Sequence, residues 1–194
     1  MLAMSCFFWF LVLSIPTGML MNKIGRKKTV LLSFVLHVLA LCIPVIAYDF
    51  TFILIAFAFV GIGNTLLQVS LNPLVTDVVS KEKLTGTLTL GQFVKAICSF
   101  LGPIITSWAA GMTFGWKLIF PIYAATSLVA LIWLWLTPIK EEEKGEAVSF
   151  GVTLNLLKDK YIIAFFIGIL VLVGADVGIN NTFPKLLMDR CNLE

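Results

Sequence analysis

Six long apolar runs, separated by short polar segments, dominate the pattern of the chain. A helix needs about 20 apolar residues to cross a bilayer, and each run is close to this length or exceeds it. The third and the last runs are interrupted by Gly, Asn or Pro. The pattern therefore predicts an all-α membrane protein with six spanning helices, over residues 2–21, 29–47, 52–78, 87–111, 117–137 and 161–187.

The Lys and Arg residues lie mainly in alternate connecting segments. Segments 22–28, 79–86 and 138–160 hold ten of the 14, the opposite side holds three, and Lys95 lies inside a predicted helix. Short loops rich in Lys and Arg stay on the cytoplasmic side of a membrane. We therefore expect these three segments to be cytoplasmic, in a multi-pass protein of the bacterial inner (plasma) membrane.

The composition agrees with a membrane protein. Hydrophobic residues make up 59% of the chain, charged residues only 13%, and the mean hydropathy is +1.00, values typical of a chain embedded in lipid. The net charge of +3 arises in loops, so it does not indicate a nucleic-acid partner. The four cysteines have no metal-ligand or disulfide spacing, and we expect neither a metal nor a cofactor.

A short basic motif stands between the first two predicted helices. The stretch from Gly18 to Lys28 reads Gly-Met-Leu-Met-Asn-Lys-Ile-Gly-Arg-Lys-Lys, and we name residues 22–28 the basic segment. It resembles the loop between the second and third helices of major facilitator superfamily transporters, with Asn22 where the family usually has Asp. Gly18 is expected at a close helix approach, and Gly25 at a tight turn with positive φ.

This resemblance implies a position for each predicted helix in a transporter of twelve helices. The six spans would correspond to helices two to seven, so we expect a partial chain that lacks the first helix and the last five. Residues 1–137 would then form most of the N-terminal bundle with five spans, 138–160 the cytoplasmic linker, and 161–194 the first span of the C-terminal bundle. The remaining helices would be its partners, together with membrane lipid.

The third predicted helix carries polar side chains every four residues, and side chains at this spacing share one helix face. Pro73 removes one backbone hydrogen bond and is expected to kink the helix. A polar stripe at membrane depth indicates a cavity lining, or alternatively hydrogen bonds between helices. We name it the amide stripe: Asn64, Gln68, Asn72 and Thr76.

The run from Gly61 to Val75 resembles the fourth helix of the fucose permease-like family of sugar:proton symporters. The Asn72-Pro73 pair matches that family, whereas position 68 is Gln where the fucose permease has a functional carboxylate. The resemblance implies a sugar-facing helix. Gln68 cannot exchange a proton, but its amide can bind a sugar hydroxyl.

Two ionisable residues lie inside later helices. Lys95 shares one face, the lysine face, with Gln92, Ser99, Gly102 and Thr106. It would pair with a carboxylate, bind an anionic substrate group, replace a coupling cation, or serve only as a structural ion. Asp176 stands in a Gly-Ala-Asp-Val-Gly run that resembles the seventh helix of the same family, and shares a face with Asn180. It is a candidate partner of Lys95 or a proton carrier.

Two further residues at or near the membrane invite an interpretation. Asp77 ends the third predicted helix, where a negative charge opposes the helix dipole and needs a cation. Arg26 is the expected partner of Asp77. This pair, together with Gly18, Asn22 and Gly25, would form a cytoplasmic latch between conformations. His37, alone on an apolar helix, is interpreted as structural rather than as a proton relay.

These patterns predict a secondary active transporter of a sugar or sugar-like solute, coupled to protons and working by alternating access. The substrate-binding candidates are Asn64, Gln68, Asn72, Gln92, Lys95 and Asn180, and the ion-coupling candidates are Lys95 and Asp176. Three alternatives are a transporter of an organic anion or drug-like solute, a non-transporting remnant or sensor, and a membrane enzyme. The last has little support, since no nucleophile–base pair or His/Asp cluster lies at membrane depth.

Overall fold

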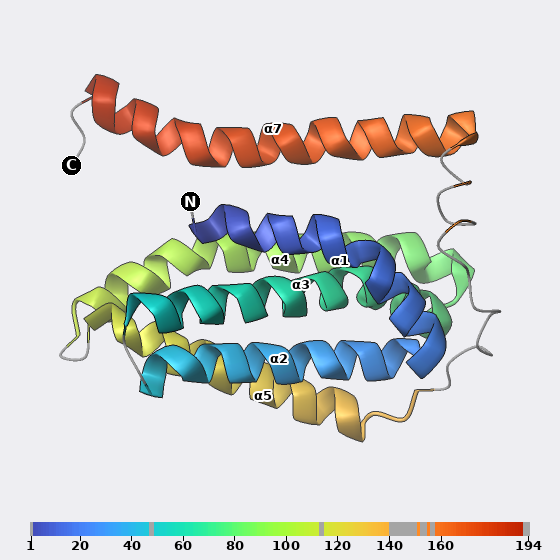
Figure 1. Cartoon of the computed structure of the whole chain (residues 1–194), viewed down its shortest axis with the longest axis horizontal. Coiled ribbons are helices and arrows are strands. Elements are labelled where there is room, and N and C mark those ends of the chain that lie inside the picture. The colour runs from blue at the N-terminus through green and yellow to red at the C-terminus, as the bar shows by residue number, and fades with distance from the viewer. Residues whose placement is uncertain are drawn as a thin grey trace. The chain divides into compact units, whose positions relative to one another are not determined.

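The elements of the computed structural model are helices (Figure 1). It describes residues 2–46, 49–112, 115–139, 151, 155 and 158–191. The chain divides into two compact units, Met1–Val148 and Ser149–Glu194, and each unit is described by itself. The boundary falls within the predicted linker 138–160, while the assignment of the two parts to transporter bundles stays a prediction.

The long helices correspond to the six predicted spans. Among the described residues, α2, α3, α4 and α5 are each long and apolar enough to cross a membrane, and α7 has a shorter apolar part, Lys160–Ala175. The predicted class, an all-α integral membrane protein, is confirmed. The first unit contains α1 (Leu2–Ile24), α2 (Arg26–Ile46), α3 (Phe50–Val78), α4 (Lys81–Ala110), the 3₁₀ turn η1 (Gly115–Leu118) and α5 (Ile119–Leu136), and the second contains α7 (Lys160–Cys191).

The helices extend further into the polar segments than the apolar runs suggested. The basic segment is not a seven-residue loop, because α1 continues to Ile24, α2 begins at Arg26, and only Gly25 stands between them. Likewise, only Val79 and Ser80 separate α3 from α4. Lys and Arg have high helix propensity, so a loss of hydrophobicity does not end a helix.

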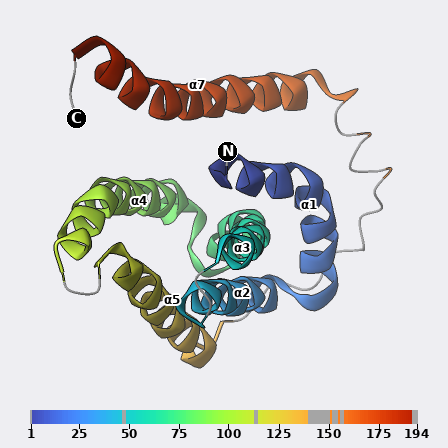
Figure 2. The same ribbon diagram turned by 60° about the vertical axis from the view of Figure 1, so that its left-hand side comes forward.

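Helix α3 is the central element of the first unit, packed mainly against α1 and α2, with α5 on the other side of α2 (Figure 2). Helix α4 makes fewer contacts. The packed faces are rich in small and hydroxyl side chains, which let helices approach closely in a membrane. The buried side chains include Thr17, Thr29, Val30, Ser33, Ala40, Ala56, Thr65, Leu66, Ser70, Leu74 and Ala109.

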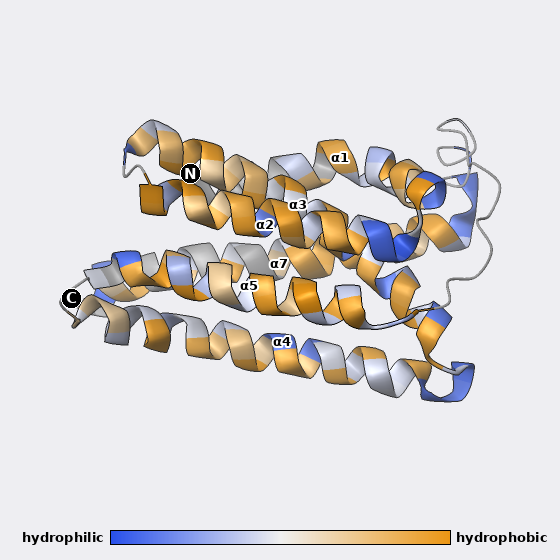
Figure 3. Cartoon of the chain, turned by 90° about the horizontal axis from the view of Figure 1, so that it is seen from below, coloured by the Kyte–Doolittle hydropathy of each residue, from blue (hydrophilic) through white to orange (hydrophobic). Residues whose placement is uncertain are grey.

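The distribution of hydropathy along the helices fits a bilayer. Apolar residues cover the middle of the helices, and hydrophilic residues gather at their ends (Figure 3). Three of the buried hydroxyl groups donate to the backbone carbonyl three or four residues earlier: Thr29 to Gly25 (2.7 Å), Ser33 to Val30 (2.7 Å) and Thr65 to Gly61 (2.8 Å). We name the end that carries the basic segment and Lys81 the basic end of the unit.

Candidate functional site

The amide stripe lies on the face of α3 that is turned away from its packed side. Leu66, Ser70 and Leu74 are buried against the neighbouring helices. They lie roughly opposite Gln68 and Asn72, which are exposed. At 3.6 residues per turn this difference in burial follows from the spacing alone. The exposed part of the stripe is therefore available to a solute or to another helix. Asn64 is half-buried and is only partly available.

The C-terminal part of the stripe, Asn72 and Thr76, adjoins Pro73, whose carbonyl oxygen is an acceptor for two side chains. It accepts hydrogen bonds from Thr76 Oγ1 (2.6 Å) and from Arg26 Nη1 (3.2 Å). The first bond uses the Thr76 hydroxyl within the helix, so Thr76 is a poorer substrate ligand than the amides. The second ties the α3 turn at Pro73 to the start of α2. The predicted kink at Pro73 stays a prediction.

The lysine face of α4 is also exposed. Lys95 lies 14 residues after the first residue of α4, about 21 Å along a helix that rises 1.5 Å per residue. It is therefore at the middle of the helix. Gln92 and Ser99 lie one turn before and one turn after it and are exposed too. Among the described residues, no carboxylate lies within ion-pair distance of Lys95.

The two candidates of α7 are placed only by their backbone. Asp176 and Asn180 belong to α7, but their side chains lie outside the described part of the structure. Helix α7 also belongs to the second unit. The proposed pairing of Lys95 with Asp176 therefore stays a prediction.

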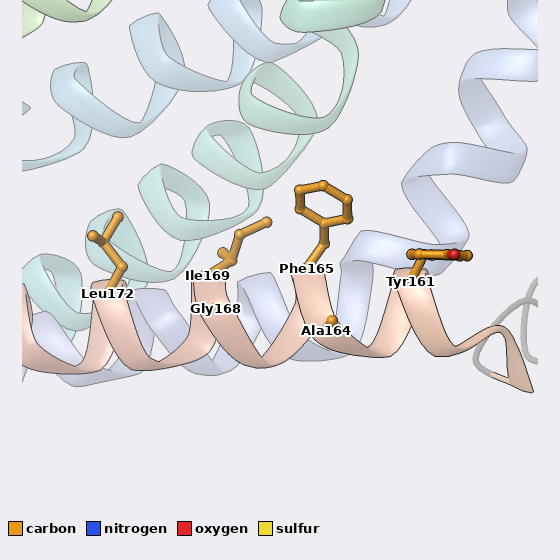
Figure 4. Close-up of a pocket in the computed structure, with 6 residues that line it drawn as sticks. All are labelled: Tyr161, Ala164, Phe165, Gly168, Ile169 and Leu172. Carbon is orange, nitrogen blue, oxygen red and sulfur yellow. The ribbon is translucent and has the colours of Figure 1, made fainter.

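Helix α7 presents an apolar hollow of about 470 Å³ near its start (Figure 4). Its lining residues recur every three or four positions, as one helix face does, and the Tyr161 hydroxyl is their one polar side-chain group. A sugar site needs several convergent polar groups, so this hollow does not suit a sugar. The lining residues are Tyr161, Ala164, Phe165, Gly168, Ile169 and Leu172.

At the basic end, the structure contains the ion pair that the sequence suggested, between Arg26 and Asp77. The Asp77 side chain is 1% exposed and that of Arg26 is 32% exposed. Gly25 is buried and has φ 103°, so the expected tight turn at this glycine is present. The role of this group as a conformational latch stays a prediction.

One member of the predicted latch does not have the environment that we expected. A side chain built at Gly18 would meet nothing within 4 Å, so Gly18 is not at a close helix approach in the described structure. The spacing of the motif could not reveal this, because the tightness of a contact depends on what lies opposite. Asn22 is half-buried in the last turns of α1.

The profile of the Major Facilitator Superfamily matches residues 1–194. The chain belongs to the Major Facilitator Superfamily. The expected resemblance to its fucose permease-like members also agrees with the comparisons that follow.

Two transporters of other bacteria are similar to this chain in sequence. A glucose/galactose transporter of Brucella abortus is 28% identical over 97% of the chain and 50% of its own length. A probable nitrate transporter of Staphylococcus carnosus is 26% identical over 76% of the chain and 37% of its own length. The chain thus spans about half the length, or less, of these relatives.

The crystal structure of the Escherichia coli fucose:proton symporter has the same fold. A variant of it superposes with a TM-score of 0.66 over 81% of the chain and 47% of the symporter, at 19% identity. A second structure, in the outward conformation, gives a TM-score of 0.63 over 80% of the chain. At this identity the likeness establishes the superfamily fold.

In this member of the superfamily, sequence reasoning missed a second attachment of the basic segment. Lys27 Nζ donates hydrogen bonds to the carbonyl oxygens of Thr137 (2.8 Å) and Trp135 (3.3 Å), at the C-terminal end of α5. A cation there offsets the negative end of the helix dipole. Arg26 and Lys27 therefore attach α2 to α3 and to α5, respectively.

His37 makes a hydrogen bond within its own helix and contacts α3, while its structural role stays a prediction. Its Nδ1–H donates to the Ser33 carbonyl oxygen (2.7 Å), since a carbonyl can only accept. A Cβ at Gly63 would lie 2.8 Å from this Nδ1, so α3 contacts the imidazole edge where a glycine leaves room. Gly63 precedes Asn64, and this contact therefore helps to set the rotation of the amide stripe.

The described residues include no group of three or more His, Cys, Asp or Glu side chains that could hold a metal. Of the four cysteines, the side chains of Cys42 and Cys98 are described, and both are free thiols. The expectation of no metal concerns the whole chain and stays a prediction.

Proposed function

We propose that the intact protein is a secondary active transporter of a sugar or sugar-like solute, driven by protons and working by alternating access. The observation that carries this proposal is the amide stripe of α3, whose Gln68 and Asn72 are exposed on the side opposite the packed face. Amides offer both donors and acceptors, which suits the hydroxyl groups of a sugar. The similar glucose/galactose transporter and fucose:proton symporter support the same substrate class and coupling ion.

In the proposed mechanism the two helix bundles of the intact protein rock about a site near the midplane. The position of Lys95 at the middle of α4 supports its assignment to such a site. A charge there is costly in hydrocarbon, by about 2.5–3.5 kcal/mol on an insertion scale. Lys95, with Asp176 as its candidate partner or as the proton carrier, supplies the ionisable chemistry of coupling.

A second candidate is transport of an anionic solute. It is favoured by Lys95, whose ammonium would bind a carboxylate or a small anion, and by the similarity to a probable nitrate transporter. The neutral amides of the stripe would then orient the anion by donating hydrogen bonds. This candidate keeps the fold and the position of the site and changes only the substrate.

The test is uptake of radiolabelled solutes by the intact protein in proteoliposomes, with and without an inward proton gradient. The panel contains neutral sugars, sugar acids and nitrate. We expect gradient-driven sugar uptake in the parent, loss of at least the gradient-driven part in Lys95→Gln, and retention in the control Lys117→Gln. Lys117 is an exposed lysine in η1, outside both polar faces.

The outcomes separate the two candidates. Uptake of sugar acids or nitrate without neutral sugars would select the anion transporter. Uptake of sugar that does not respond to the gradient would reject proton coupling but keep the substrate class. Absence of uptake for every solute in the panel would reject both substrate classes.

A further inference from the structure

The end of α5 carries an apolar hollow of about 570 Å³, distinct from both polar faces. Four of its lining side chains project from one face of the last turns of α5 and are exposed, with Trp133 at 75% and Leu136 at 71%. It lies at the basic end of the first unit, since Lys27 reaches the adjacent carbonyls. The lining residues are Val129, Ile132, Trp133, Leu136, Thr137 and Pro138.

The hollow lies on the face of α5 that is turned away from α2. Helix α5 packs mainly on α2 (Figure 2), and Ser127, Leu131 and Leu134, which lie on the other side of α5, are half-buried. Helix α5 has no charged residue along its length. An outward face of this kind is suited to acyl chains rather than to water or a polar partner.

A cation stands at the same place. Lys27 Nζ lies 2.8 Å from the carbonyl oxygen of Thr137, and Thr137 itself lines the hollow. The carbonyls of a helix C-terminus disfavour an anion, and the Lys27 ammonium offsets this negative potential. Lys28, exposed in the next position of the first turn of α2, adds a second positive charge.

The end of α5 therefore has an apolar surface, then an interfacial tryptophan, and then the Lys27 cation. Tryptophan is enriched at the level of lipid headgroups, and both Trp133 and Trp135 are more than two-thirds exposed there. An anionic phospholipid has the same order of groups, with acyl chains in the apolar layer and a phosphate at the interface. Polybasic segments at this level attract anionic lipid by about 1 kcal/mol per Lys or Arg.

We propose that this hollow is a binding site for one anionic phospholipid of the leaflet at the basic end. The acyl chain lies against Ile132, Trp133 and Leu136, and the phosphate lies beside Lys27. The bound lipid would cover the junction where Lys27 holds the end of α5 to the start of α2. The lipid would thereby stabilise the attachment of the basic segment that also carries Arg26.

The experiment measures the thermal unfolding midpoint of the intact protein in detergent, titrated with dioleoyl phosphatidylglycerol, dioleoyl phosphatidylcholine or inorganic phosphate. A ligand that binds the folded state raises the midpoint. We expect a saturable rise with phosphatidylglycerol, a smaller rise with phosphatidylcholine of the same chains, and none with phosphate. Lys27→Gln should weaken the apparent affinity for phosphatidylglycerol about fivefold.

Two further variants keep the test decisive. Lys83→Gln removes an exposed lysine of α4 near the basic end, outside the hollow, and should leave the affinity for phosphatidylglycerol unchanged. Val129→Trp fills the hollow without touching Lys27, and should abolish the response to both lipids even if Lys27→Gln proves too unstable to measure. Equal responses to the two lipids, equal losses in Lys27→Gln and Lys83→Gln, or a full response to inorganic phosphate would each overturn the proposal.

Discussion

The guanidinium of Arg26 and the carboxylate of Asp77 form an ion pair that joins the first turn of α2 to the last turns of α3. Asp77 sits at the C-terminal end of α3, where the helix dipole disfavours a negative charge, and its side chain is almost fully buried. Arg26 offsets both costs and also binds the Pro73 carbonyl one turn earlier. One side chain thus links the basic segment to the helix that carries the amide stripe.

We expect Asp77→Asn to destabilise the protein by about 3 kcal/mol, the lower end of the range for removing one partner of a buried pair. The lower end applies because Arg26 is one-third exposed and can regain water. Thermal unfolding in detergent measures the change, and the exposed Glu82→Gln is the control. If the pair is also a latch, Asp77→Asn alters the rate of conformational exchange; unchanged stability and exchange would reject both roles.

A second prediction concerns the contact between Gly63 and His37. Gly63→Ala should destabilise the protein by about 1–3 kcal/mol, the usual effect of overpacking, because the new methyl group would lie 2.8 Å from the imidazole and 3.2 Å from the Ser33 carbonyl oxygen. Adding His37→Ala should recover part of the loss. Unfolding midpoints of the two single variants and the double variant form the cycle that measures this coupling.

Gly86→Ala is the matched control for that cycle. A side chain at Gly86 meets nothing within 4 Å and the residue lies inside α4, where Ala is the better helix former by about 1 kcal/mol. We therefore expect the same substitution to be neutral or stabilising there. A similar loss at both glycines would show that the His37 contact is not the cause.

The third prediction concerns the amide stripe and rests on the proposed function. Gln68→Leu should raise the KM for the transported solute about threefold to tenfold, the equivalent of one hydrogen bond, and leave the unfolding midpoint nearly unchanged because Gln68 is exposed. Thr126→Val is the control, since its hydroxyl is on α5 and bonds to its own helix. If the KM for uptake is unchanged in Gln68→Leu, Gln68 does not bind the transported solute.

Much of this architecture is readable from the sequence, because each apolar run of membrane length can form only a helix there. Helix ends are less predictable from the sequence, because Arg26 and Lys81 belong to helices although they lie outside the apolar runs. The Arg26–Asp77 pair was readable because charge complementarity identifies both partners. The contact of Lys27 with Thr137 was not, since its acceptor is a backbone carbonyl, a group that every residue has.

The candidate site was read only in part for a related reason. The amide stripe follows from spacing along one helix, and its exposure agrees with that pattern. The pairing of Lys95 with Asp176 depends on how two units of the chain meet, which no pattern within one helix determines. Spacing places residues on a face, whereas a site between helices requires knowledge of their arrangement.

The last prediction separates the two glycines of the basic motif. Gly25 has φ 103°, a conformation that costs an L-residue about 1–2 kcal/mol. Gly25→Ala should therefore destabilise the protein by at least this amount. It should also weaken the contacts of Arg26 and Lys27, which occupy the next two positions. Gly18→Ala should have no such effect, because its side chain would meet nothing within 4 Å. Unfolding midpoints of the two variants test this directly. Equal losses would place Gly18 at a close helix contact after all, whereas a loss confined to Gly25→Ala would show that the motif needs its second glycine for the turn.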